Sequence, residues 1–274
     1  MICSGLYTPL ITPFRDNKLD EEGLKQNIAR QKVCAGIVAL GTTGETPTLT
    51  ENEKTRILEI AKESGQTLIV GCSHSSTEAL LEQVQHYEMA DALLVASPAY
   101  NKPTQEGLYR HFSMVAEKSP KPIILYNIPG RTSVNIEPET IARLKDKVIG
   151  IKECNILQAP TTIATGVPVL AGDDAWILPL IALGAKGAIA AGGNVVPEQL
   201  NALVELALDG DYETAREIHF KLLPLFKAGS WESNPIPYKG MMELMGLPSG
   251  DPRMPLLPFS DKTRLQKVLC ALDS

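Results

Sequence analysis

Cysteine and histidine are scarce in this chain of 274 residues, and neither falls in a recognisable ligand pattern. The five cysteines contain no CxxC pair, and the four histidines contain no HExxH spacing. Disulfide frameworks and structural zinc sites need paired or clustered ligands. We therefore expect free, largely buried thiols, no metal site and no cofactor.

Basic residues and long apolar runs are also lacking. Lysine and arginine number 26 against 32 acidic residues, a net charge of −6, so the basic face that a nucleic-acid partner requires is not expected. The apolar stretch 175–185 contains Pro179 and stops at Lys186, short of the roughly 20 residues of a membrane span. Residues 1–5 carry no basic region typical of a secretory signal, which favours a cytoplasmic location and no membrane partner.

Eight short β-rich runs alternate with amphipathic stretches instead. Parallel strands need helical crossovers, and no GxGxxG follows the first run as in a doubly wound sheet. We predict an α/β fold, a (β/α)₈ TIM barrel over residues 1–210, with a C-terminal helical extension over 211–274. The predicted strands are 6–12, 36–40, 67–70, 92–96, 122–126, 148–152, 168–170 and 187–190.

Helix signals complete this pattern. We predict that residues 197–209 form the last helix of the barrel and that the extension contains helical runs at 212–227, 237–245 and 261–272. Two capping boxes are predicted, one from Thr50 to Glu53 and one from Ser75 to Glu78, because a hydroxyl three residues before a glutamate can satisfy open backbone donors.

Lys152 ends the apolar run 148–152, where a purely structural strand would carry no charge. In an alternating strand it shares a face with Gly150, which leaves room beside it. Desolvation disfavours the ammonium form, and a neutral amine can attack a ketone to form a Schiff base. The alternative is a strand-end lysine that reaches water.

Other reactive side chains follow the ends of predicted strands, where barrel enzymes place their catalytic groups. Thr42 and Thr43 lie between glycines whose exposed amides suit a small carboxylate. Tyr100 and Tyr126 can pass a proton, with Thr43 between the two phenols. Structural alternatives remain for each: a tight turn for the threonines and core positions for the tyrosines.

Two further strand ends carry charge. Arg131 follows a Pro-Gly turn, and its guanidinium fork matches a substrate carboxylate, although an exposed surface arginine is the alternative. At the seventh strand, Gly172 leaves backbone close to the site. The two aspartates after it are expected to cap the following helix rather than to act in catalysis.

Five motifs together carry a resemblance to a known family. In order and spacing they resemble the dihydrodipicolinate synthase family of class I pyruvate-dependent aldolases and lyases, which also includes N-acetylneuraminate lyase. The resemblance covers nearly the whole chain. The motifs are Gly-Thr-Thr-Gly-Glu at 41–45, the segment 100–107, Leu-Tyr-Asn-Ile-Pro-Gly-Arg-Thr at 125–132, Ile-Lys-Glu at 151–153 and Asn-Pro-Ile-Pro at 234–237.

The resemblance implies a 4-hydroxy-tetrahydrodipicolinate synthase, a lyase that condenses pyruvate with L-aspartate 4-semialdehyde on the route to diaminopimelate and lysine. It implies that Lys152 forms the pyruvate Schiff base, without a cofactor. Tyr126, Thr43 and Tyr100 match a proton-relay triad, with Tyr100 supplied by a neighbouring subunit.

Binding roles are implied in the same way. Thr42 and Thr43 match the loop that receives the pyruvate carboxylate, and Gly172 and Ile189 match positions lining the lysine pocket. Arg131 matches the arginine that binds the carboxylate of the aldehyde, and it distinguishes the synthase from lyases acting on sugar acids, the nearest enzymatic alternative.

The implied assembly is a homodimer or homotetramer. Ala99 departs from the family, because many members have a second tyrosine before Tyr100 that interlocks the subunits, and this leaves dimer and tetramer both open. A barrel of the same fold that has lost catalysis is the alternative from another class, and the intact reactive side chains argue against it.

Overall fold

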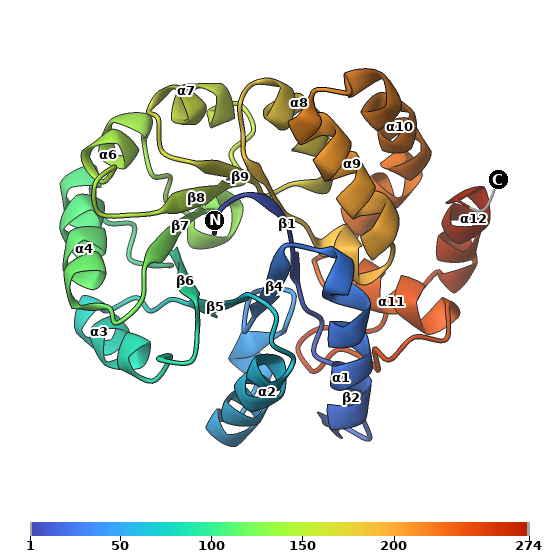
Figure 1. Ribbon diagram of the computed structural model, residues 1–274. Coiled ribbons are helices and arrows are strands. Elements are labelled where there is room, and N and C mark those ends of the chain that lie inside the picture. The colour runs from blue at the N-terminus through green and yellow to red at the C-terminus, as the bar shows by residue number, and fades with distance from the viewer. Residues whose placement is uncertain (1, 273–274) are drawn as a thin grey trace.

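Eight parallel strands close into a barrel in the computed structural model, which describes residues 2–272 (Figure 1). Each strand pairs with the next along the chain, and β10 pairs with β1 through Gly5 and Gly187. The predicted fold class is confirmed, and all eight predicted strands are present with ends moved by a few residues. The barrel strands are β1 Gly5–Pro9, β4 Gly36–Ala39, β5 Leu68–Cys72, β6 Ala92–Ala96, β7 Ile123–Asn127, β8 Gly150–Glu153, β9 Val169–Ala171 and β10 Gly187–Ile189.

Helices follow every strand and form the outer ring that parallel pairing requires (Figure 1). The short helix α5, Pro129–Thr132, lies in the loop between β7 and α6. The crossover helices are α1 Glu21–Arg30, α2 Glu51–Glu63, α3 Thr77–Gln85, α4 Gln105–Lys118, α6 Pro138–Arg143, α7 Ala159–Ala164, α8 Ile177–Ala182 and α9 Pro197–Asp209.

Alternation along the strands divides the buried side chains into two cores. In β7, Ile124 and Tyr126 point into the barrel, whereas Ile123 and Leu125 pack in the larger core shared with the helices. Ile151 of β8 likewise packs outward, so its neighbour Lys152 points inward, as the sequence predicted.

Three helices continue the chain beyond the barrel: α10 Tyr212–Gly229, α11 Ile236–Leu244 and α12 Lys262–Leu272. They gather on the side of the barrel where α8, α9 and α1 lie, drawn orange to red in Figure 1. Helix α10 packs against α8 and α9, and α11 packs against α12 and the short helical turn Ala191–Asn194. The division of the chain at residue 210 stays a prediction.

Two local features differ from expectation. A two-stranded hairpin, β2 Phe14–Arg15 and β3 Lys18–Leu19, follows β1, and Asp16 and Asn17 form its tip with positive φ. The Thr50–Glu53 capping box is present, but the second box is wrong. Ser76 caps α3 by accepting from the Ala79 amide, while the Ser75 hydroxyl donates to the Ala99 carbonyl.

No helix within residues 2–272 is both long enough and apolar enough to cross a membrane.

Candidate active site

A cavity of about 220 Å³ lies at the carboxyl ends of the strands, between the barrel and the segment that joins α10 to α11. The structure brings most of the sequence-predicted side chains together in it. Those that line the cavity are Thr43, Tyr126, Arg131, Lys152, Gly172 and Ile189.

Lys152 and Tyr126 are direct neighbours across β7 and β8. Both side chains are buried, and the Lys152 Nζ lies 4.6 Å from the centre of the Tyr126 ring. The space beside Gly150 is occupied by Cys3. A Cβ added at Gly150 would lie 2.8 Å from the Cys3 Sγ. The small residue therefore accommodates the N-terminal segment below the lysine.

Burial and charge act in opposite directions on the pKa of Lys152. Burial is the largest influence and lowers this pKa, but the negative charges available to Tyr126, Cys154 and Asp174 together leave it raised. Burial also raises the pKa of the Tyr126 phenol, and it raises the pKa of the Cys154 thiol to about 11. Near neutral pH both are uncharged, so the Asp174 carboxylate, whose pKa burial raises to about 6, is the charged partner.

This balance differs from the neutral amine expected from burial alone. The pKa of Lys152 is raised rather than lowered, so nucleophilic attack needs a neighbouring group that can remove a proton from the amine.

The two threonines of the β4–α2 loop have different contacts. The Tyr126 phenol shares a hydrogen bond with the Thr42 side chain, which acts to lower the phenol's pKa. The Thr43 Oγ1 accepts a hydrogen bond of 2.9 Å from the Asn234 Nδ2. Tyr126 is thus linked to Thr42 here, whereas the sequence predicted Thr43 between the two phenols.

Arg131 lies at the mouth of the cavity on α5. Its Nη2 donates to the Ser233 Oγ and to the Asn234 carbonyl oxygen, both at 3.2 Å. These contacts orient the guanidinium toward the segment before α11, and the side chain stays accessible from outside. The placement at the mouth agrees with the sequence prediction.

Tyr100 does not line this cavity. Its side chain is 92% exposed, on the loop between β6 and α4, and its φ of 72° is unusual for a residue with a bulky side chain. The Asn101 Nδ2 and the Ser75 hydroxyl fix the loop from below by hydrogen bonds of 2.7 and 2.9 Å. The backbone is thus held while the ring projects outward.

Among the cavity residues that were not assigned to the site from the sequence, three make polar contacts that shape it. Asn234 and Tyr238 come from the C-terminal extension, and Asp174 follows β9. The Asp174 carboxylate accepts from the amides of Ala191 and Gly192 and, at 3.0 Å, from the Tyr238 phenol. Such a set joins residues up to 64 positions apart, and no spacing in the sequence marks it.

The other aspartate of this loop behaves as predicted. Asp173 caps the helical turn Asp174–Trp176 by accepting from the Ala175 amide at 3.0 Å. Among residues 2–272, no three His, Cys, Asp or Glu side chains are grouped so that they could hold a metal ion.

Comparison with known proteins fits this geometry. The model of the dihydrodipicolinate synthetase family matches residues 2–272. The chain belongs to this family. A 4-hydroxy-tetrahydrodipicolinate synthase from Methanocaldococcus jannaschii is 43% identical over 280 residues, which span 97% of each chain.

Solved structures of the family agree in fold. Dihydrodipicolinate synthase from Thermotoga maritima superposes with a TM-score of 0.95 at 38% identity, covering 100% of this chain and 99% of that one. A monomeric dihydrodipicolinate synthase variant superposes with a TM-score of 0.94 at 38% identity, covering 98% and 97%. The family resemblance read from five sequence motifs is confirmed.

Proposed function

We propose that this chain catalyses the 4-hydroxy-tetrahydrodipicolinate synthase reaction, in which pyruvate condenses with L-aspartate 4-semialdehyde in lysine and diaminopimelate biosynthesis. The observation that carries the proposal is the buried Lys152 amine beside Tyr126, in a cavity with Arg131 at its mouth. Family membership over residues 2–272 supports the same reaction. The enzyme is a lyase of the class I aldolase type.

Lys152 is the nucleophile. Its amine adds to the keto carbon of pyruvate and water leaves, which gives a protonated imine on the lysine. The imine withdraws electrons, so a methyl proton departs and an enamine forms. The enamine carbon attacks the aldehyde carbon, and the amino group of that substrate then displaces Lys152 as the ring closes.

Tyr126 and Thr42 carry protons between these steps. The phenol is adjacent to the Lys152 amine and shares a hydrogen bond with the Thr42 side chain. Because the pKa of Lys152 is raised, its amine must lose a proton before attack, and a phenol in a hydrogen-bonded chain is a suitable route. The relay hydroxyl is therefore assigned to Thr42, while Thr43 faces the cavity and receives the pyruvate carboxylate.

Arg131 binds the carboxylate of the aldehyde substrate. The Asn234 carbonyl and the Ser233 hydroxyl occupy only one nitrogen of its guanidinium, Nη2, which leaves further donors free. Gly172 and Ile189 line the pocket around Lys152 and shape the space for pyruvate.

Tyr100 completes the relay in a neighbouring subunit, within a homodimer or homotetramer. Its ring is exposed on a loop whose backbone is fixed, as a group presented to another subunit would be. A test is to mix Tyr100→Phe subunits with Lys152→Ala subunits. Recovery of activity in the mixture supports donation between subunits, and no recovery in a confirmed hybrid contradicts it.

The reaction is tested by intact-mass spectrometry after addition of pyruvate and borohydride. We expect one reduced pyruvate adduct on the parent chain and none on Lys152→Ala. Turnover with L-aspartate 4-semialdehyde then separates the synthase from a lyase acting on a sugar acid. The absence of an adduct on folded parent protein would support a barrel that has lost catalysis.

A further inference from the structure

The loop that carries Thr42 and Thr43 leaves the barrel in an unusual backbone conformation. Leu40 before it and Glu45 after it both have φ of 54°, a left-handed region that residues with side chains rarely adopt. The Thr12 hydroxyl donates to the Gly44 carbonyl at 2.7 Å and fixes one side of the turn. A loop of this kind needs further contacts to persist.

A buried ion pair provides the first of them. The Glu45 carboxylate contacts the Lys239 Nζ of α11 at 2.5 Å, with the two side chains 1% and 2% exposed. Its other oxygen accepts from the Arg253 amide at 2.8 Å. Lys239 also lies 4.3 Å from the centre of the Phe14 ring and donates to the Asp251 carbonyl. The C-terminal extension thus contacts the end of the threonine loop directly.

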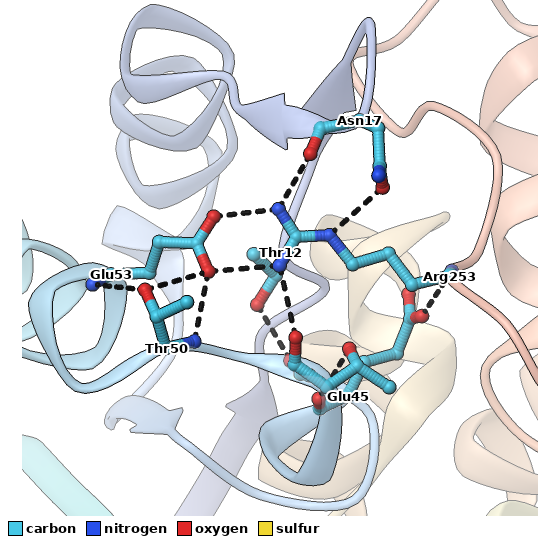
Figure 2. A network of polar contacts seen from close by, with 8 residues as sticks. Thr12, Asn17, Glu45, Thr50, Glu53 and Arg253 are labelled. Carbon is cyan, nitrogen blue, oxygen red and sulfur yellow. Dashed lines mark hydrogen bonds and ion pairs between the residues drawn. The ribbon is translucent and has the colours of Figure 1, made fainter.

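Arg253 makes the second connection, which Figure 2 shows together with Glu45, Glu53 and Asn17. Its guanidinium binds both oxygens of Glu53, at 2.6 and 2.8 Å, and donates to the Thr48 carbonyl at 3.0 Å. It also donates to the side chain and the carbonyl of Asn17 at the tip of the β2–β3 hairpin. One side chain therefore joins the segment after the threonine loop to a separate hairpin.

We propose that Lys239 and Arg253 are positioning residues of the reaction, which together hold the Thr42–Thr43 loop in register with Tyr126. Lys239 and the Arg253 backbone amide act through Glu45, and the Arg253 guanidinium acts through Thr48 and Glu53. This inference rests on the proposed function. A buried ion pair contributes little net stability compared with apolar groups, but it fixes geometry, because either charge left alone in the interior is strongly unfavourable. The Glu45–Lys239 ion pair and the Arg253 contacts therefore fix the position of the Thr42 and Thr43 hydroxyls rather than adding to the stability of the fold.

The deciding variant is Glu45→Gln combined with Lys239→Met. It removes both buried charges together, so neither is left unpaired, and the glutamine oxygen can still accept from the Arg253 amide. We expect thermal stability close to the parent's, whereas each single variant is less stable. We expect kcat to fall about tenfold to a hundredfold, as for a small misplacement of a reacting group.

The two Michaelis constants should separate. The KM for pyruvate should rise several-fold, because the threonine loop receives its carboxylate. The KM for the aldehyde should change little, because Arg131 is held by Ser233 and the Asn234 carbonyl instead. Arg253→Lys keeps the charge near Glu53 but loses most of the fork, and should give an intermediate loss.

Hydrogen exchange of the peptide covering residues 40–49 gives a readout that does not depend on turnover. We expect faster exchange there in the double variant. The matched control is Glu243→Gln with Lys262→Met, an exposed ion pair of the same residue types on α11 and α12, which should change neither kinetics nor loop exchange. Leu265→Ala, a buried change in α12, calibrates the kinetic effect of lost stability.

Parent-like kinetics or parent-like loop exchange in the double variant would overturn the proposal. The proposal would also be overturned if the double variant lost no more activity than Leu265→Ala loses for the same decrease in thermal stability. A parent protein that forms no pyruvate adduct would instead refute the proposed function. The exchange measurement would still decide whether Lys239 and Arg253 hold the loop.

Discussion

Replacing Tyr238 by phenylalanine should make the stability of the fold more sensitive to pH. The Tyr238 phenol donates to the buried Asp174 carboxylate at 3.0 Å and favours its charged form. A hydrogen bond to a charged group contributes about 1.5 to 3 kcal/mol, equivalent to about one to two pKa units. The variant should therefore raise the pKa of Asp174 from about 6 to the range of about 7 to 8.

The sign of the stability change follows from linkage. The folded pKa of Asp174 already exceeds its ordinary value of 3.8, so the folded state binds this proton more tightly and loses stability as pH rises through that interval. In the variant the loss continues to higher pH. We expect no charge-dependent difference from the parent at pH 5 and a deficit of about 1.5 to 2.5 kcal/mol at pH 8.

Urea denaturation at several pH values measures this difference. Tyr87→Phe is the matched control, because the Tyr87 hydroxyl is buried and accepts from the Gln83 Nε2 rather than donating to an acid. Its cost should be the same at pH 5 and pH 8. A Tyr238→Phe deficit that is also independent of pH would refute the assignment of Asp174 as the charged group beside Lys152.

Further changes probe the loop, the mouth and the barrel wall. Thr42→Val should lower kcat about tenfold to a hundredfold through the relay, and Thr43→Val should mainly raise the KM for pyruvate; identical effects in steady-state kinetics would contradict the two assignments. Arg131→Lys should raise the KM for the aldehyde about tenfold without slowing borohydride-trapped imine formation, and equal losses in both would contradict its role. Gly71→Ala should lower the unfolding free energy by about 1 to 3 kcal/mol, because its Cβ would lie 2.6 Å from a backbone carbonyl oxygen. Gly130→Ala, with nothing within 4 Å, should have little effect in the same denaturation assay.

Local sequence patterns predicted the barrel well. Each strand is marked by a short β-rich run, and consecutive strands of a parallel barrel are neighbours, so Lys152 and Tyr126 could be placed on adjacent strands. Their direct pairing is known only from the structure. The β2–β3 hairpin was missed because its strands have only two residues each. The start of α3 was placed one residue too early: Ser76 is the N-cap, and no capping box forms because the third residue after it is Ala79.

The site residues that could be predicted from the sequence are those at the ends of strands. The sequence could not show which of the two adjacent threonines contacts the Tyr126 phenol. Their side chains are identical, and the conformation of the loop decides which one points toward Tyr126. Glu45 and Lys239 lie almost two hundred positions apart, and each alone resembles an ordinary surface charge. Asn234 had a visible signal, a polar residue in a Pro-rich turn, but only the fold shows its contact with Thr43.

The contacts of Asn234, Lys239 and Arg253 with the β4–α2 loop bear on how the protein is made. During synthesis the threonine loop leaves the ribosome early. The residues that contact it are synthesised about two hundred residues later. A nascent chain with a finished barrel would therefore carry Lys152 and Tyr126 but lack the groups that orient their partners. The threonine loop would therefore be held in its final position only when translation is nearly complete.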